Sequence, residues 1–269
     1  SHTDVHHVKP IKPLPSRKSE KNVPWIDCFT APCKGGCPIA QDIPEYMELC
    51  NKGLYGPALK LITEKNPLPF ITGTICAHRC QTKCSRNFYD ESVRIRDTKL
   101  LAAQKGYNAL MASIKRPAKV AGKRVAIIGG GPTGIAAAYF CGRAGIETTI
   151  FERESCLGGV PRHVIPAFRI ANEVIEKDIA LMEQYGVEVK CGAPAPSVDE
   201  LKKMGYTHIL LAVGAWKPGK LDIAGDVAGA IQWMKGVKAG NIGVAGNIAV
   251  IGGGNTAMDA ARLARRSGA

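Results

Sequence analysis

Six cysteines in two closely spaced runs are the residues best suited to metal chemistry in this chain. Thiolates at such spacing favour soft metal ions, and a Cys-Pro pair that closes the first run is typical of iron-sulfur cluster binding. Structural zinc more often uses pairs of Cys-x-x-Cys, and neither run has that spacing. We predict iron-sulfur ligation, with zinc and structural or free thiols as the alternatives. The predicted ligands are Cys28, Cys33, Cys37, Cys76, Cys80 and Cys84.

Six thiolates do not complete two clusters of four ligands each. Five other residues of this region carry a ligating atom without a compelling pattern, namely Asp27, Cys50, His78, Glu91 and Asp97. Cys50 lies in an amphipathic helical pattern, where a buried core residue is the simpler interpretation.

A glycine-rich loop after an apolar run is the second chemical feature. Gly129, Gly131 and Gly134, with Pro132 and Thr133 between them, have the spacing of a dinucleotide-binding fingerprint. The glycines allow a tight turn and a close approach of backbone to a pyrophosphate, which lies on free amides at a helix N-terminus. Residues 147–151 read as the next strand. Glu152, followed by Arg153, then falls about 20 residues after the glycines, where an acid accepts ribose hydroxyls.

The fingerprint occurs a second time near the end of the chain. Its residues are Gly252, Gly254, Asn255, Thr256 and Ala257. An apolar strand-like run precedes this loop and a helix is predicted after it, so the chain carries the marks of two dinucleotide sites. The next strand and its ribose-reading residue are not in the sequence, which leaves NADH and NADPH both open. Three arginines are predicted to lie on the solvated face of that helix, namely Arg262, Arg265 and Arg266.

Length and composition bound the remaining possibilities. The chain has 269 residues, 45% of them hydrophobic, and no run of 18 apolar residues, so we expect a soluble, cytoplasmic, multi-domain protein without membrane spans. The polar N-terminus without Met indicates a processed or engineered end. The net charge of +13 is spread along the chain without a nucleic-acid motif, so acidic redox partners or nucleotides are expected rather than nucleic acid.

These elements predict an α/β fold in which a small all-α iron-sulfur domain precedes a Rossmann-like dinucleotide-binding domain. Short helices are predicted over 41–49, 55–64 and 93–113. The predicted boundaries are a tail or linker at 1–22, the helical cysteine-rich domain at 23–116, the dinucleotide domain at 117–245, and the start of a second nucleotide-binding domain at 246–269.

The order of these modules resembles the electron-input half shared by the glutamate synthase small subunit and the N-terminal part of dihydropyrimidine dehydrogenase. It is most similar to large iron-sulfur flavoproteins described as selenate reductases. The residues that carry the resemblance are the runs from Asp27 and Asn66, GlyGlyVal from Gly158, IleProAlaPheArgIle from Ile165, and the run from Gly252 to Arg262.

The resemblance implies FAD on the Gly129 loop and Glu152, with Gly159 and Val160 against the cofactor and Arg169 in contact with it. It implies NAD(P)H on the Gly252 loop and 4Fe-4S clusters on the cysteines. Hydride would pass from NAD(P)H to FAD, and electrons to the clusters and to a reductase site on remaining domains or another subunit, which makes this chain a fragment.

Two departures from the pattern concern the clusters. Trp25 stands where relatives often have a further cysteine, and Lys99 stands where they place a Glu or Gln ligand. An ammonium has no lone pair to donate, so incomplete or unusual ligation is expected. The alternative function is a non-catalytic nucleotide- and metal-binding interaction module. The run LeuLeuAlaValGlyAla from Leu210 argues against it, because it fits the strand and turn by which a flavin domain returns to its cofactor.

Overall fold

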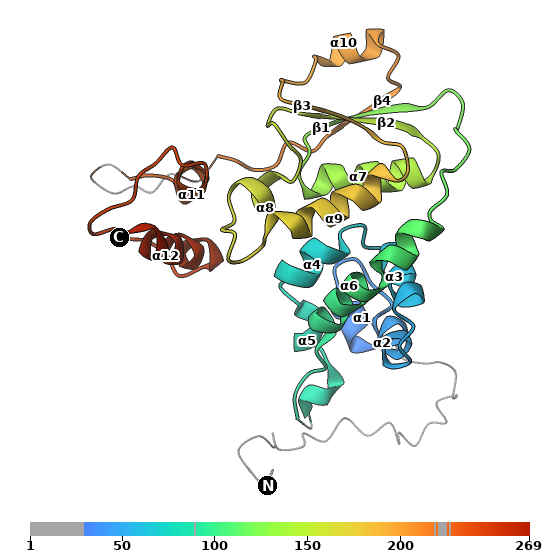
Figure 1. The fold of residues 1–269 in the computed structure, drawn as a ribbon, viewed down its shortest axis with the longest axis horizontal. Coiled ribbons are helices and arrows are strands. Elements are labelled where there is room, and N and C mark those ends of the chain that lie inside the picture. Colours follow the sequence, from blue (N-terminus) through green and yellow to red (C-terminus); the bar gives the residue numbers. More distant parts are fainter. Residues whose placement is uncertain (1–29, 89, 218, 220–224, 226) are drawn as a thin grey trace, which may run out of the picture. The chain divides into compact units, whose positions relative to one another are not determined.

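The computed structural model describes residues 30–88, 90–217, 219, 225 and 227–269. They form two compact units that divide between Ala112 and Ser113 (Figure 1). The predicted tail at 1–22 and the predicted ligand Cys28 lie outside the described residues. No helix in the described part of the chain is long and apolar enough to cross a membrane.

The first unit is helical in its described part. Its helices are α1 (Pro32–Gly36), α2 (Ile43–Asn51), α3 (Tyr55–Thr63), α4 (Pro69–Ile75), α5 (Arg79–Thr82), a 3₁₀ turn (Ser85–Phe88) and α6 (Ile95–Ser113). The three predicted helices are therefore confirmed, with ends shifted by a few residues. Proline stands in the first turn of α1, α2 and α4, where its fixed φ suits the helix and its missing N–H costs nothing.

A small core joins α2, α3 and α6. Ile43 and Tyr46 of α2, Ala58 and Ile62 of α3, and Ala102 of α6 are almost completely buried and pack together. Cys33 and Cys37 pack against the same cluster, and Cys80 belongs to it. The core of this unit and its cysteine runs are thus one structure.

The second unit is built on a parallel sheet of β1 (Arg124–Ile128), β2 (Glu147–Glu152), β3 (Glu188–Cys191) and β4 (His208–Leu211), in the order β3-β2-β1-β4. Helices α7 (Pro132–Arg143) and α9 (Asn172–Glu183) lie on one side of the sheet and α10 (Val198–Lys203) on the other (Figure 1). A strand covered on both faces is apolar almost throughout. The central strands follow this rule, since Ala126, Ile127 and Ile150 are fully buried. The predicted strands at 147–151 and at Leu210 are confirmed.

The end of the chain forms α11 (Ala230–Lys238) and α12 (Asn255–Ser267). The predicted helix after the second glycine loop is confirmed, but the predicted strand before it is wrong for this structure. Within residues 227–269 no strand forms, and Ile248 and Ile251 are 39% and 62% exposed. A strand needs a hydrogen-bonded neighbour, and β1 has two such neighbours while this run has none among the described residues.

Candidate functional site

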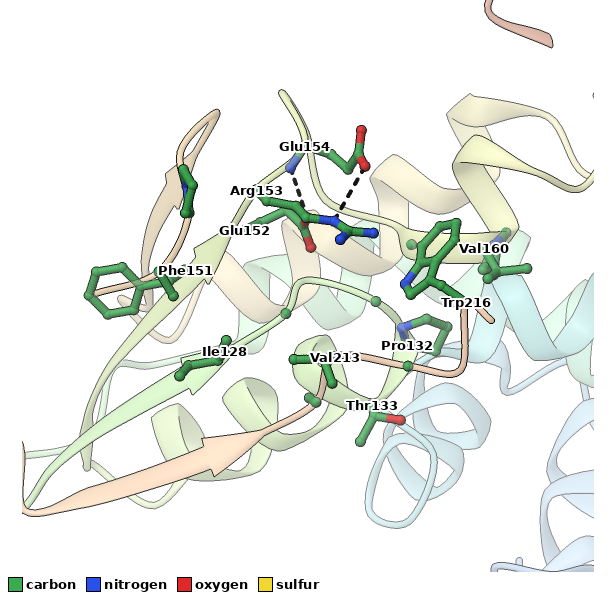
Figure 2. A pocket seen from close by; sticks show the side chains of 18 of the residues that line it. Ile128, Pro132, Thr133, Phe151, Glu152, Arg153, Glu154, Val160, Val213 and Trp216 are labelled. Atoms are coloured by element: carbon green, nitrogen blue, oxygen red, sulfur yellow. Dashed lines mark hydrogen bonds and ion pairs between the residues drawn. The ribbon is translucent and has the colours of Figure 1, made fainter. Parts of the chain in front are cut away.

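A cavity of about 590 Å³ opens at the carboxyl ends of β1, β2 and β4 (Figure 2). In open α/β sheets, ligands bind in the crevice outside these strand ends. The volume is within the range of small-molecule and cofactor sites. Its lining includes most predicted dinucleotide residues of the first fingerprint, namely Gly129, Gly131, Pro132, Thr133, Glu152, Arg153, Gly159 and Val160.

The first glycine loop has the close packing that its spacing predicts. A Cβ on Gly134 would lie 1.9 Å from the carbonyl oxygen of Gly129, so only glycine lets α7 begin so near β1. Gly129 itself has a φ of +109°, a conformation that glycine adopts at little cost. Gly131 stands directly before α7 and offers no side-chain cap. The first amides of α7 are therefore free to bind an anion, as a pyrophosphate requires.

Glu152 ends β2 beside this loop and is 7% exposed. One carboxylate oxygen accepts a hydrogen bond from the Gly130 amide at 2.6 Å. The other accepts one from the Glu154 amide at 2.9 Å (Figure 2). A carboxylate has about four acceptor positions, so two backbone bonds fix it and leave capacity for ribose hydroxyls. Glu152 is thus a buried, oriented acceptor in the wall of the cavity.

Two further segments complete the wall. Gly158 and Gly159 turn with φ of +126° and +54°, and a Cβ on Gly159 would lie 2.7 Å from Cα of Gly131. The segment after β4 approaches from the other side, since a Cβ on Gly129 would lie 2.4 Å from the oxygen of Ala212. The backbone of these two segments therefore converges on the glycine loop.

Sequence reasoning missed Trp216, which also lines the cavity. Arg153 and Lys235 place their cations 5.4 Å from the centre of its ring, and Lys235 of α11 forms a 2.6 Å ion pair with Glu154. Trp216 follows the β4 turn without a motif of its own. Gln232 of α11, which donates to its carbonyl oxygen, lies 16 positions later, beyond the repeat of any single helix or strand, so no sequence signal was available.

The contact with FAD that the resemblance implies for Arg169 stays a prediction. Arg169 is not among the residues that line the cavity, and it forms a 2.6 Å ion pair with Asp259, a buried residue of α12. A buried carboxylate needs a cation or hydrogen-bond donors, and Arg169 supplies them.

The second glycine loop repeats part of the geometry of the first. Gly252 has a φ of +126°, and a Cβ added to it would lie 3.4 Å from Cβ of Ala257. A Cβ added to Gly253 or Gly254 would have no other atom within 4 Å. Asn255 and Thr256 open α12 next to this loop. Of the three arginines predicted on the solvated face, all are exposed, but two also stack on Phe168 at 4.4 Å, namely Arg262 and Arg266.

The two cysteine runs meet in the first unit. α1, which contains Cys33, packs against α5, which contains Cys80, and a Cβ on Gly36 would lie 2.9 Å from Cγ of Lys83. Burial raises the pKa of Cys33, and the charges of Cys84 and Cys37 raise it further. Burial and then the charge of Cys37 likewise raise the pKa of Cys80. Thiols of the first run therefore face thiols of the second.

The described thiols of the two runs are partly or fully removed from solvent. Cys33, Cys37 and Cys76 are half-buried, and Cys80 and Cys84 are buried. Within the described residues, no group of three or more Cys, His, Asp or Glu side chains is arranged to hold a metal ion.

Lys99 lies beside these thiols and is only 6% exposed. Burial lowers its pKa, while the charges of Cys76, Cys80 and Cys37 act in the opposite direction. Of the other suggested ligands, Cys50 is a buried core residue of α2, as predicted, and the ring of His78 lies 3.1 Å from the carbonyl oxygen of Cys76. The side chain at this position, beside the thiols, is therefore a buried lysine and not a Glu or Gln ligand.

An ionic clamp holds the first cysteine run. Asp42, just before α2, binds Lys34 of α1 through one oxygen and Lys65 through the other at 2.8 Å. Lys65 also donates to the carbonyl oxygen of Ala40, a residue with φ of +46°. The two hydrogen-bonded lysines lower the pKa of Asp42. The clamp fixes the chain directly after Cys37.

Two family models match the chain. Residues 18–109 match "Dihydropyrimidine dehydrogenase domain II, 4Fe-4S cluster", and residues 123–269 match "Pyridine nucleotide-disulphide oxidoreductase". The predicted fold class, an iron-sulfur domain followed by an α/β oxidoreductase domain, is thereby confirmed. The predicted cofactors, FAD, NAD(P)H and a 4Fe-4S cluster, are those of these two domains.

Curated relatives combine the same two parts. The chain is 40% identical over 261 residues to the oxidoreductase YgfK of Escherichia coli, covering 95% of this chain and 25% of the relative. It is 33% identical over 259 residues to the NADPH-Fe(3+) oxidoreductase subunit beta of Geobacter sulfurreducens, covering 91% and 38%. It is 30% identical over 265 residues to the glutamate synthase [NADPH] small chain of Mycobacterium tuberculosis, covering 91% and 54%. The chain thus spans between a quarter and about half of these relatives.

Proposed function

Because this chain belongs to the pyridine nucleotide-disulphide oxidoreductase family, we propose that it is the electron-input module of a larger iron-sulfur flavoenzyme. In this role hydride passes from NAD(P)H to FAD, and electrons pass on through iron-sulfur clusters to a reductase site in other domains or another subunit. Two of the relatives are named as a subunit or a small chain of an enzyme that uses NADPH, which supports both NADPH as donor and a partner subunit. We propose a cytoplasmic location, where NADPH is available.

The cavity at the carboxyl ends of the strands is the observation that carries this proposal. It combines free amides at the start of α7, a glycine loop without side chains, and the buried Glu152 carboxylate. These three groups complement a pyrophosphate, its close approach to the backbone, and a ribose. An interaction module without a cofactor has no need of this combination.

FAD supplies the hydride-accepting ring and the ability to release electrons one at a time. The residues of this chain bind and orient it. The α7 amides hold the pyrophosphate, Glu152 holds the ribose of the adenosine, and Gly159 and Val160 leave room for the flavin. Arg153 lies at the same wall, where its charge favours the phosphates.

The cysteine-rich unit is proposed to hold the iron-sulfur clusters, with Cys33, Cys37, Cys76, Cys80 and Cys84 as ligands together with Cys28. Convergence of the two runs supports shared use of both. The proposed domain boundaries remain those of the sequence, at 23–116 for this unit, 117–245 for the FAD domain and 246–269 for the start of the NAD(P)H domain. The loop at Gly252 and Gly254, with Asn255, Thr256 and Ala257, is proposed to bind NAD(P)H.

An anaerobic absorption spectrum of the chain reconstituted with FAD, iron and sulfide tests the proposal. A flavin band near about 450 nm and a shoulder near about 410 nm are expected, and both should bleach when NADPH is added to the complete enzyme. Gly134→Val, which obstructs the start of α7, is the matched variant that should lose the flavin band alone. A colourless protein that binds stoichiometric zinc would contradict the cluster assignment, and a protein without the flavin band would contradict the FAD site.

A further inference from the structure

Trp216 is the one tryptophan among the cavity residues that neither the fingerprint nor the resemblance assigns to the cofactor. It is half-buried and follows the β4 turn that touches the glycine loop. Part of its surface packs into an apolar cluster with Val160, Val164 and Met234. Another part lines the cavity. The indole is therefore anchored on one side and available to a ligand on the other.

The start of α7 and the Glu152 carboxylate together fix the direction in which a bound dinucleotide lies. The backbone N–H groups that follow Pro132 in the first turn of α7 hold the pyrophosphate, since Pro132 itself has no N–H, and Glu152 holds the ribose on one side of it. Figure 2 shows Glu152 between two ends of the cavity, with Phe151 and Ile128 at one end and Val160 and Trp216 at the other.

The adenosine half belongs to the first of these ends. Ala195, which follows β3 and also lines the cavity, packs against Phe151 and Ile128 there. The flavin half must then extend from the pyrophosphate in the opposite direction, toward Val160 and Trp216. The residue at that end is aromatic, and its indole is large enough to cover a planar heteroaromatic ring.

Charged side chains hold the indole in place. Lys235 of α11 forms a 2.6 Å ion pair with Glu154 and lies 5.4 Å from the centre of the Trp216 ring. Gln232, also of α11, donates to the carbonyl oxygen of Trp216 at 2.6 Å. The Arg153 cation lies over the same ring at 5.4 Å. Cation–π contacts within about 6 Å are attractive, so α11 and the β2 turn together orient the ring.

We propose that Trp216 is the aromatic wall against which the isoalloxazine ring of FAD lies, positioned by the Glu154–Lys235 ion pair across the cavity. The proposal rests on the proposed function, because it needs FAD in this cavity. It adds a specificity determinant for the flavin half of the ligand, which the glycine loop and Glu152 do not contact. The indole should bind flavin ring systems and contribute little to the binding of ADP, which has no such ring.

The test is a titration of the chain with FAD and, separately, with ADP. Trp216→Ala should bind FAD about tenfold more weakly, since aromatic pairs contribute about 0.5–1.5 kcal/mol beyond the area they bury. ADP affinity should change by less than about twofold. Trp216→Phe, which retains a ring, should bind FAD within about threefold of the unaltered chain. Trp233→Phe is the matched control, because Trp233 packs in the same apolar cluster but does not line the cavity.

Flavin fluorescence is the second readout, independent of affinity. An indole stacked on the isoalloxazine quenches its emission, so bound FAD should be more fluorescent in Trp216→Ala than in the unaltered chain or in Trp233→Phe. Circular dichroism of each variant checks that the fold is kept.

The possible results separate the two proposals. If the unaltered chain binds FAD but Trp216→Ala binds it equally well with equal emission, the role of Trp216 is refuted and the FAD site stands. A loss of FAD and ADP binding by the same factor would also refute it, because the residue would then act on the whole cavity. If the unaltered chain binds neither FAD nor ADP, the proposed function fails and the role of Trp216 fails with it.

Discussion

Replacing Glu152 by Gln tests the central acid of the cavity with the smallest change of shape. Each carboxylate oxygen accepts a backbone N–H, from Gly130 at 2.6 Å and from Glu154 at 2.9 Å. The amide of Gln has one acceptor oxygen, so one of the two buried amides must face an NH₂ group. The loss of charge on the remaining bond costs about 1 kcal/mol, and the unsatisfied donor costs about 1–3 kcal/mol. We expect the second unit to lose about 2–4 kcal/mol.

Thermal unfolding and FAD titration measure the two consequences of Glu152→Gln. A domain of this size melts about 2–4 °C lower per kcal/mol, so the midpoint should fall by about 4–16 °C. FAD should bind roughly tenfold more weakly, because a charge-assisted hydrogen bond to the ribose becomes a neutral one. Glu188→Gln is the control, since Glu188 is an exposed acid on β3 that pairs with Lys190 and accepts a hydrogen bond from the Thr149 hydroxyl. If Glu152→Gln matches this control in both assays, the carboxylate neither holds the loop nor binds the cofactor.

Three further predictions concern the other parts of the site. Cys80→Ser should lose iron in a reconstituted chain, while Cys50→Ala should keep it and cost about 1 kcal/mol by its small cavity; equal iron content in both would remove Cys80 from the ligands. Asp42 has a pKa below its ordinary value of 3.8, so its ion pairs should add about 1 kcal/mol above that pH and lose it as the pH falls through the lowered pKa; melting of Asp42→Asn between pH 3 and 6 should therefore depend less on pH than that of the unaltered chain. Gly134→Ala should lower the melting point and abolish FAD binding, because its Cβ would lie 1.9 Å from a carbonyl oxygen, whereas Gly253→Ala, with no atom within 4 Å, should do neither; similar behaviour of both would show that the tight turn is unnecessary.

The fold was predictable where the signal is local. β1 and β2 read as strands because each carries a run of β-branched and apolar residues, at 125–128 and 148–151, and α7 was predictable from the small residues after the glycine loop. The edge strand β3 was not predicted. Its sequence, Glu-Val-Lys-Cys, is mostly exposed and takes its strand conformation from pairing with β2. Propensity alone does not reveal such a strand, because tertiary pairing decides it.

In the candidate site, too, the parts that depend on local sequence could be predicted and the parts that depend on tertiary contacts could not. The glycine spacing and the position of Glu152 follow from the geometry of one strand-turn-helix-strand unit, which is continuous in sequence. The Glu154–Lys235 ion pair joins residues 81 positions apart, and the convergence of the cysteine runs depends on how α1 packs against α5. No pattern of period 2 or 3.6 encodes these contacts, so the sequence predicted the loop and Glu152 but not the position of Trp216 in the cavity wall.

The ion pair between Arg169 and Asp259 could not be inferred from the resemblance. The resemblance implies a cation beside the flavin, and in the structure that cation is bound to Asp259, a residue 90 positions later in the helix that follows the second glycine loop. Asp259 is 6% exposed, and a buried carboxylate without a partner costs several kcal/mol. Arg169 cannot leave it for a cofactor unless another donor replaces it. The segment after α8 and the helix of the second dinucleotide loop are therefore joined through one ion pair, supported by Phe168 beneath Arg262 and Arg266. Arg169 thus links the segment after α8 to α12, and its contact with FAD stays a prediction.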